Sequence, residues 1–353
     1  MMKSKEIGSE FWTFEKGTKA SNTRKTYLSG RTALTAIILD LEQRGLESVC
    51  LPEYCCESMI EPFLRQGMKV AFYPVRKTQT GLELSLEGSI GGDAVLLVDY
   101  FGFMAEELRE LIQHLISIGK TTILDLTHAV FADERYFGAE YVFGSYRKWT
   151  GVELGFASGK YTHGLPSWGI NEAGREYLSL RTRARSIKSE FVADGYRNES
   201  LRREQLRLFN EAEELLDREY LSDTDDENKT SMWSLGAAYI KNKRRENAKE
   251  IYSYFVQLKV CRPIFSELPG DTIPLAVPVL VADGKRDSLR AFLRKNGVFC
   301  PIHWPMSSLH RVGKDSLMLF ENELSFVCDQ RYETSEMMRM MEMVKQWEMN
   351  TSA

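Results

Sequence analysis

A carboxylate and an amine in the first half of the chain each lie beside the end of an apolar run. Asp125 ends the run in ILDLTHA, and Lys148 follows Ser145, the last residue of YVFGS, by three positions. Short apolar runs of this kind are typical of strands in a buried parallel sheet. Because ligands of open α/β sheets bind outside the carboxyl ends of the strands, we expect the three side chains to face one crevice.

A carboxylate and a lysine that share one crevice are the two groups that pyridoxal 5'-phosphate (PLP) requires. This cofactor withdraws electrons while its ring nitrogen is protonated, and an anionic carboxylate keeps that proton in place. A lysine holds the aldehyde as a Schiff base, and the same amine can then move protons on the substrate. The pair predicts a PLP site with Asp125 at the ring nitrogen and Lys148 as the Schiff-base lysine. Taken singly, each would be interpreted as a strand-end cap or an exposed loop residue.

A cofactor with a phosphate also needs a site for that dianion, and the stretch YLSGRTALTAII offers one. It places Ser29, Gly30, Arg31 and Thr32 directly before a helical pattern. Backbone N–H groups at the start of a helix attract phosphate, and glycine lets the backbone approach closely. A simple helix cap uses the same residue types, so the stretch indicates a phosphate site only together with the carboxylate and the lysine.

The apolar pattern predicts the sheet that must position these residues. Strand-like runs alternate with helical segments through the first two-fifths of the chain, which favours a parallel α/β sheet with right-handed crossovers. Long charged helices are predicted from about residue 170 to 250. The acidic stretch 222–231 interrupts them, and we predict it to be an unpacked hinge loop. Beyond it, the patterns predict a smaller α+β unit.

Composition argues against several classes of function. A formal net charge of −4, with scattered Lys and Arg, gives no basic footprint for nucleic acid. No apolar run approaches the ~20 residues of a membrane span, and the start shows no signal-peptide pattern, so we expect a cytoplasmic protein. The six cysteines and five histidines have no metal-site spacing, and we expect reduced thiols and no metal.

Taken together, the motifs resemble the PLP-dependent sugar aminotransferases of the DegT/StrS type. The resemblance runs from about residue 27 to 340 and rests on the order of SGRTAL, LPEYCCES, LLVDYFGF, ILDLTHAVF, FGSYRKW, PIHWP and LSFVCDQRYE. It implies fold type I, with a large α/β domain whose mostly parallel seven-stranded sheet is flanked by helices. We place this PLP-binding domain, with a short N-terminal arm, at residues 1–235 and a small α+β domain at 236–353. The resemblance also implies a homodimer, whose sites lie at the subunit interface.

The resemblance implies roles for the phosphate-binding residues. Gly30, Arg31 and Thr32 match the family's phosphate-binding stretch, in which Arg31 replaces a threonine and adds a positive charge. Ser145 matches a serine that bonds the phosphate. These four residues are therefore expected to contact the cofactor.

The ring of the cofactor has its own matching residues. Asp125 matches the partner of the ring nitrogen, and Lys148 matches the Schiff-base lysine. His128, three residues after Asp125, matches a position near the ring hydroxyl. The residue that packs against the ring face falls in PEYCCES, where Tyr54 and Cys56 are both possible.

The activity that the resemblance implies is transamination. An amino donor, expected to be glutamate or glutamine, would leave its amino group on the cofactor, and the keto group of a nucleotide-linked sugar would accept it. His303 in PIHWP falls where the family approaches the substrate, although it could equally be a packing residue of a strand. Another PLP reaction, such as a dehydration or a lyase step, uses the same lysine and aspartate and stays open.

Two stretches depart from the family's pattern. GVELG stands after the lysine where the family has GEGG. The Asn and Arg segment that reaches a partner subunit's phosphate has no clear match, and Arg181, Arg183 and Lys188 are candidates for it. The same basic run could be a charged helix face. These departures keep open a PLP-fold protein that binds ligand without turnover.

Overall fold

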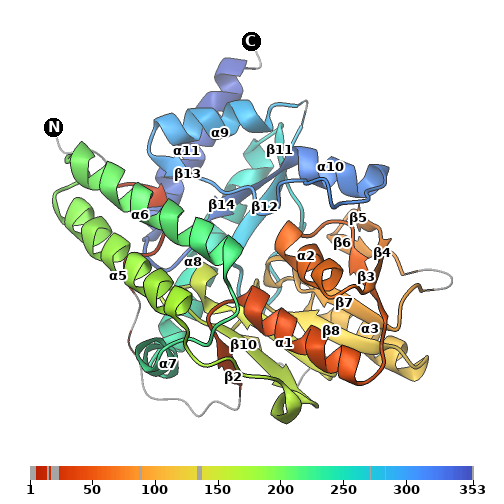
Figure 1. The fold of residues 1–353 in the computed structure, drawn as a ribbon. Coiled ribbons are helices and arrows are strands. Elements are labelled where there is room, and N and C mark those ends of the chain that lie inside the picture. The colour runs from red at the N-terminus through yellow and green to blue at the C-terminus, as the bar shows by residue number, and fades with distance from the viewer. Residues whose placement is uncertain are drawn as a thin grey trace.

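The computed structural model of the chain describes residues 5–13, 16, 24–86, 90–132, 137–270, 272–282 and 284–351. Its centre is a seven-stranded sheet in the order β2-β10-β9-β8-β7-β3-β4 (Figure 1). The strands are β2 (Lys25–Tyr27), β3 (Ser48–Pro52), β4 (Lys69–Tyr73), β7 (Ala94–Val98), β8 (Thr121–Asp125), β9 (Tyr141–Ser145) and β10 (Gly155–Gly159). Strand β10 runs antiparallel to both of its neighbours, whereas β4, β3, β7, β8 and β9 are parallel. The predicted parallel α/β sheet is confirmed.

Helices cover this sheet, and its central strands are buried. Helix α1 (Gly30–Gln43) packs on β9 and β10, α2 (Glu57–Arg65) on β4, and α3 (Ala105–Ser117) on β8. All residues of β7 and β8 are buried, as expected for parallel strands covered on both faces. A short hairpin of β5 (Val75–Lys77) and β6 (Leu82–Leu84) follows β4. The polar residues that end β8 and β9 therefore mark one edge of a fully packed layer.

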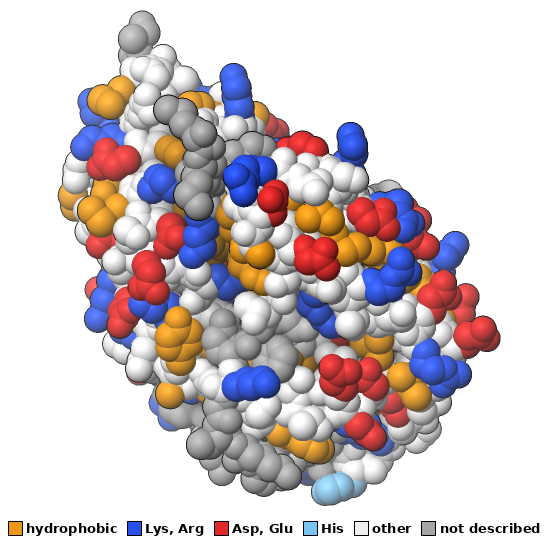
Figure 2. Space-filling view, turned by 90° about the vertical axis from the view of Figure 1, so that its left-hand side faces the viewer, with side chains coloured by type: hydrophobic (Ala, Val, Ile, Leu, Met, Phe, Trp, Pro, Cys, Tyr) orange, Lys and Arg blue, Asp and Glu red, His pale blue; other side chains and the backbone are white. Residues whose placement is uncertain are grey.

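Two long helices, α5 (Glu172–Ala193) and α6 (Glu199–Arg218), lie side by side as an antiparallel hairpin beside the sheet (Figure 1). On the face of the molecule seen in Figure 2, basic and acidic side chains are interspersed. Each helix is capped at its N-terminus, α5 by Asn171 and α6 by Asn198, whose side chains accept hydrogen bonds from the first turn.

The prediction of an unpacked loop over 222–231 is wrong in part, because Asp226–Trp233 forms helix α7. Asp225 caps this helix by accepting a hydrogen bond from the N–H of Asn228 at 2.8 Å. Thr224 donates to the carbonyl of Glu153 at 2.7 Å, and the Asn228 side chain accepts from the N–H of Glu153. The stretch thus supplies one cap through Asp225 and, through Thr224 and Asn228, contacts with a distant loop that no local pattern reveals.

After helix α8 (Ala237–Tyr254) comes a second group of strands and helices, which we call the second layer. Strands β11 (Cys261–Pro263), β12 (Ala276–Val281) and β14 (Glu323–Val327) form an antiparallel sheet in that order. Helices α9 (Arg286–Lys295), α10 (Lys314–Asn322) and α11 (Thr334–Thr351) accompany it. A separate hydrophobic core joins these elements, and one of its members is Ile7 from the start of the chain.

The N-terminal segment is bound to this second layer. Strand β1 (Ile7–Gly8) pairs in parallel with β13 (Val298–Phe299), and the Tyr332 hydroxyl accepts a hydrogen bond from the Gly8 N–H at 2.9 Å. Arg331 donates to the carbonyl oxygens of Ser9 and Glu10, both at 3.1 Å. The segment from Ile7 to Glu10 is therefore part of the second layer's hydrogen-bonded structure.

None of the described helices is long and apolar enough to cross a membrane. In the described part of the chain, no group of three or more His, Cys, Asp or Glu side chains is placed to hold a metal ion.

Candidate active site

The ends of two neighbouring parallel strands bring three polar side chains together. Strand β8 ends at Asp125 and β9 at Ser145, and the 3-10 turn Tyr146–Lys148 then directs Lys148 toward them. All three side chains line one cavity. Of the other residues that the sequence selects, this cavity is also lined by Gly30, Arg31, Cys56 and His128. Asp125 and Ser145 lie close together because β8 and β9 are parallel neighbours, with Asp125 paired to Phe143.

Lys148 is a half-buried amine next to a buried imidazole. Its Nζ lies 3.2 Å from Nε2 of His128. The Phe101 N–H donates to Nδ1 of His128 at 3.4 Å, so the ring hydrogen of a neutral His128 is placed on Nε2. Burial lowers the pKa of the Lys148 amine, while the nearby Cys56 and Asp125 oppose that shift. Burial, with Lys148 and His303 nearby, holds the pKa of His128 well below its usual range.

Phe101, which positions His128, has an uncommon backbone conformation. Its φ is 60°, in the left-handed region that side chains other than glycine rarely adopt. Its carbonyl accepts a hydrogen bond from the N–H of Leu275 at 3.1 Å, so the strained turn is held by the segment before β12. The turn therefore links the wall of the cavity to the second layer.

Asp125 is positioned as a buried acceptor. Its side chain is 6% exposed, and Oδ1 accepts a hydrogen bond from the Thr127 N–H at 2.6 Å. Burial raises the pKa of the Asp125 carboxyl, whereas the bond from Thr127 and the charge of Lys148 lower it. A cationic group bound beside Asp125 would lower that pKa further and keep the carboxylate ionised.

The wall opposite the sheet comes from the segment after β13. Trp304 lies parallel to the His128 ring, with centroids 5.0 Å apart, and it lines the cavity. His303 packs edge-on against His128 at 4.9 Å. Its Nδ1 is buried and has no hydrogen-bond partner among the described residues. Sequence patterns gave Trp304 no functional role.

The structure separates the two candidates for the ring-stacking position. Cys56 lines the cavity at the start of α2, and its Sγ lies 2.9 Å from the Ser58 hydroxyl. Tyr54 lies behind the wall, in edge-on contact with Trp304 at 4.7 Å and with Phe320 at 4.9 Å. Cys56 is therefore the residue that faces the cavity, and Tyr54 supports Trp304 from behind.

The start of helix α1 lies against the end of β9. A Cβ added to Gly30 would lie 3.4 Å from the Cβ of Ser145, which shows how closely the helix start packs on the end of β9. The amides of Gly30 and Arg31 begin the helix and have no preceding turn to bond to. Ser29 caps the helix by accepting from the Thr32 N–H at 3.1 Å. The geometry and the helix dipole favour an anion at this point.

Two residues that we predicted to contact the phosphate, Thr32 and Arg31, bond to other residues of the chain. The Thr32 hydroxyl donates to the carbonyl of Tyr220 at 2.5 Å, and Thr32 is not part of the cavity wall. The Arg31 guanidinium bonds Asp217 at 2.8 Å and packs on the Tyr220 ring, although Arg31 does line the cavity. The backbone amides, with Ser145, thus offer the more direct contacts to an anion.

The loop that departs from the family's pattern is rigidly held. Glu153 in GVELG is 1% exposed, and its carboxylate bonds Arg181 and Arg185, each at 2.7 Å, and the Tyr177 hydroxyl at 2.8 Å. A Cβ on Gly155 would lie 2.0 Å from the Ser29 carbonyl oxygen, so only glycine fits there. Arg181, considered above as a contact to a partner subunit, therefore makes its ion pairs within the chain.

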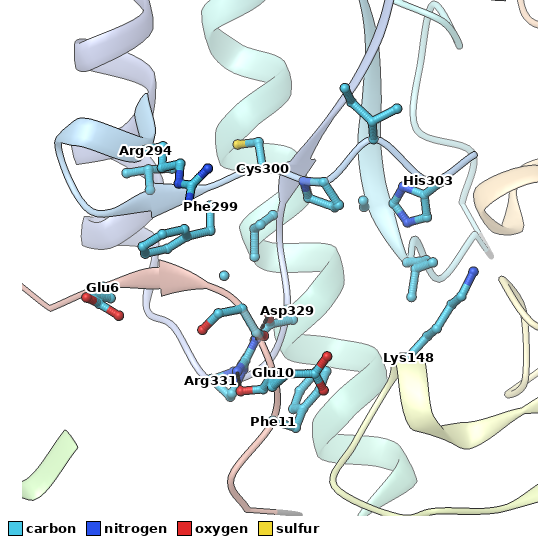
Figure 3. A pocket seen from close by; sticks show the side chains of 18 of the residues that line it. Glu6, Glu10, Phe11, Lys148, Arg294, Phe299, Cys300, His303, Asp329 and Arg331 are labelled. Atoms are coloured by element: carbon cyan, nitrogen blue, oxygen red, sulfur yellow. Dashed lines mark hydrogen bonds and ion pairs between the residues drawn. The ribbon is translucent and has the colours of Figure 1, made fainter. Parts of the chain in front are cut away.

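A larger cavity of about 820 Å³ also has Arg147 and Lys148 in its wall. Figure 3 shows Lys148 and His303 at one end of it, and Arg294 and Phe299 at the other. We call these the inner end and the outer end. Between them lie residues of the N-terminal segment, including Phe11, which packs under the Arg331 guanidinium at 3.9 Å. The cavity therefore runs between the sheet, the hairpin and the second layer.

Solved structures with the same fold are sugar and related aminotransferases. The aminotransferase TlmJ from Streptoalloteichus hindustanus is 15% identical, with a TM-score of 0.65 over 94% of this chain and 87% of that one. PseC from Helicobacter pylori is 14% identical, with a TM-score of 0.63 over 92% and 86%. DesI, solved in the presence of its TDP-sugar product, is 14% identical, with a TM-score of 0.62 over 92% and 80%.

No protein-family description matches the sequence, and no curated protein is similar to it. The comparisons therefore establish the fold, which is that of the aminotransferases the motifs resemble, and the predicted fold class is confirmed.

Proposed function

We propose that the protein is a PLP-dependent aminotransferase. The observation that carries this proposal is the meeting of Asp125, Lys148 and the start of α1 around one buried cavity, with Ser145 between them. These groups match the ring nitrogen, the aldehyde and the phosphate of PLP. When bound, PLP withdraws electrons from the amino-bearing carbon of a substrate, which makes a proton on that carbon easier to remove.

Residues of the chain itself would bind the cofactor, move protons and exclude water. Asp125 would hold a proton on the ring nitrogen, and the Gly30 and Arg31 amides would hold the phosphate together with Ser145. Lys148, whose amine is shifted toward the neutral form by burial, can carry a proton between substrate and cofactor. His128 approaches the lysine and, with its stacked neighbour Trp304, keeps water from the reacting atoms.

For the acceptor we propose the keto group of a nucleotide-linked sugar, with glutamate or glutamine as the donor. The proposal is supported by the fold shared with DesI, which was solved with a TDP-sugar product, and with other aminotransferases. His303 lines the large cavity together with Lys148, which would let it contact an acceptor. We further propose a cytoplasmic homodimer, whose mass can be measured by light scattering after size exclusion.

The test uses the purified protein with added PLP. Visible absorbance of a lysine-bound cofactor is expected, and Lys148→Ala should remove it, whereas Lys160→Ala, an exposed lysine after β10, should not. Glutamate should convert the cofactor to its amine form, and Lys148→Ala should slow that conversion by more than about 10³-fold. A protein that shows no such absorbance, or equal absorbance in both variants, would refute the PLP site.

The same measurement separates the alternatives. A lyase or dehydratase would leave the cofactor in its aldehyde form after glutamate, and a non-catalytic binding protein would show absorbance with no conversion by any donor. Either result would replace transamination.

A further inference from the structure

The carbonyl group of Trp149, the residue that follows Lys148, is bonded by two side chains from the C-terminal part of the chain. Gln330, which lies after β14, donates to it from Nε2 at 2.8 Å, and Arg244 of helix α8 donates from Nη2 at 3.5 Å. The Arg244 guanidinium also lies over the Trp149 ring, 4.3 Å from its centroid. Both the backbone and the ring of Trp149 are therefore held from outside the seven-stranded sheet.

The indole of Trp149 also joins the lysine to the loop after Asp125. Its Nε1 donates to the Thr127 carbonyl at 2.8 Å, and the Thr127 N–H is the group that bonds the Asp125 carboxylate. Trp149 is fully buried, so water does not compete for these bonds. The place of Trp149 therefore affects the positions of both residues to which we assign the chemistry.

Arg244 forms a second route to the lysine, through His128. Its side chain is fully buried, and its fork of N–H groups donates to the Leu275 carbonyl and to Oε1 of Gln330, each at 2.8 Å. The Leu275 N–H bonds the carbonyl of Phe101, whose own N–H bonds His128 beside the lysine. One guanidinium thus joins the segment before β12, the segment after β14 and the wall of the site.

We propose that Arg244 and Gln330 are positioning residues that orient Lys148. They do so by fixing Trp149. This inference rests on the proposed function and adds to it residues that lie outside the cavity of Asp125. Gln330 lines neither cavity, so any effect of it on the lysine must pass through its neighbours rather than through contact with a ligand. The lysine would have to reach both the cofactor and the substrate, and a misplacement of about 1 Å can cost about 10²-fold in rate.

Two variants weaken these bonds without removing a side chain. Gln330→Glu keeps the shape and the oxygen that accepts from Arg244, but replaces the donating amide group by a second carboxylate oxygen. Arg244→Lys keeps a cation but loses the planar fork that reaches several acceptors at once. The matched control is Arg245→Lys, since Arg245 is the next residue of α8 and donates to the carbonyls of Pro269 and Thr272 instead.

Hydrogen exchange on the full chain, with and without PLP, tests the bonding directly. The amides of Trp149 and Thr150 both donate to the Tyr146 carbonyl, at 2.8 and 3.1 Å, across the turn that carries the lysine. Their exchange should be about five- to tenfold faster in both test variants, because a buried bond that holds this turn is lost. The control variant should exchange at these two amides as the unaltered protein does.

A kinetic measurement separates positioning from a general loss of structure. With PLP bound, the rate of cofactor conversion at saturating glutamate should fall about tenfold in Gln330→Glu, because the lysine is oriented less well. The glutamate concentration at half-saturation should not change, since Gln330 lines neither cavity. Arg245→Lys should change neither quantity.

Unchanged exchange at Trp149 and Thr150 in both test variants would overturn the inference, as would an unchanged saturating rate in Gln330→Glu. Equal changes in Arg245→Lys would also overturn it, because they would indicate a general loosening of α8. If the unaltered protein shows no conversion by glutamate, the proposed function is refuted, and the exchange measurement alone then decides whether Trp149 is held in this way.

Discussion

Beside the inner end of the large cavity the ionisable side chains are held by fixed neighbours, whereas at the outer end Arg290 and Arg294 are exposed and form no ion pair with any described residue. Lys148, His128 and Asp125 touch fixed neighbours from the sheet and from the segment after β13. Arg290 and Arg294 extend from one side of an exposed helix. Two cavities that share Arg147 and Lys148 in their walls therefore combine a preformed site with an adaptable one.

The difference separates two kinds of response to substitution. Chemistry at a carbon atom requires groups held to within a fraction of an ångström, with pKa values set by burial. Exposed side chains with few contacts can be replaced at little cost in stability. The inner end should therefore respond to substitution through stability and turnover, and the outer end only weakly.

The largest effect is expected beneath the inner end, at Glu153. Glu153→Gln removes the carboxylate that bonds buried Arg181, leaving positive charge without its nearest counter-charge. The free energy of unfolding should fall by about 3–5 kcal/mol. Urea unfolding at a fixed protein concentration measures it, with Glu204→Gln as the control, since Glu204 forms an exposed pair with Arg207 and its loss should change the stability little. Equal losses would show that burial of the network contributes nothing.

In the smaller cavity beside the inner end, Asp125→Asn should keep the shape of the site but remove its negative charge. Turnover should fall by about 10²–10³-fold, because a charged contact in a buried site is lost, while the lysine-bound absorbance of the cofactor persists. Stopped-flow spectra with glutamate test this. Unchanged conversion would show that Asp125 does not act on the ring nitrogen.

His303 makes the inner end sensitive to acid. Burial, with Lys148 nearby, holds the pKa of His303 well below 6.5, so below pH 6.5 the unfolded chain binds a proton that the folded chain does not. The stability from the neutral ring is complete above pH 6.5 and is lost as the pH falls. Relative to His303→Asn, the unaltered protein should lose about 1.4 kcal/mol per pH unit below 6.5. Parallel pH profiles of unfolding would contradict this.

The smallest effect is expected at the outer end. Phe299→Leu keeps an apolar side chain but removes the ring beneath the Arg202 guanidinium, which lies 5.8 Å from the ring centroid. The free energy of unfolding should fall by about 0.5–1 kcal/mol, as for an exposed contact of a cation with a ring. Urea unfolding beside Glu153→Gln measures the contrast. A loss as large as that of Glu153→Gln would show that the two ends are held equally tightly.

Sequence patterns identified those residues of the candidate active site that lie at or just after the ends of strands. Asp125, Ser145 and Lys148 could be selected because a parallel sheet puts the carboxyl ends of its strands at one edge. Strand β2, with three residues, is too short to show a period, and no apolar pattern predicted it. The resemblance supplied the seventh strand that the pattern did not.

Contacts between distant segments could not be read from the sequence. The stacking of Trp304 on His128 joins residues from opposite halves of the chain. The choice between Tyr54 and Cys56 depends on how the turn before α2 meets Trp304. The strained backbone of Phe101 leaves no mark in the residue types, because glycine is the usual signal for a positive φ.

The pairing of β1 with β13 has a practical consequence for handling the protein. Strand β1 lies in the sheet that carries Phe299, so the N-terminal segment sits beside the outer end of the cavity. Helix α11 ends at Thr351 in an exposed position, with no part in either cavity. Affinity tags and attachment to a sensor surface should therefore use the C-terminal helix, so that they leave the cavity unobstructed.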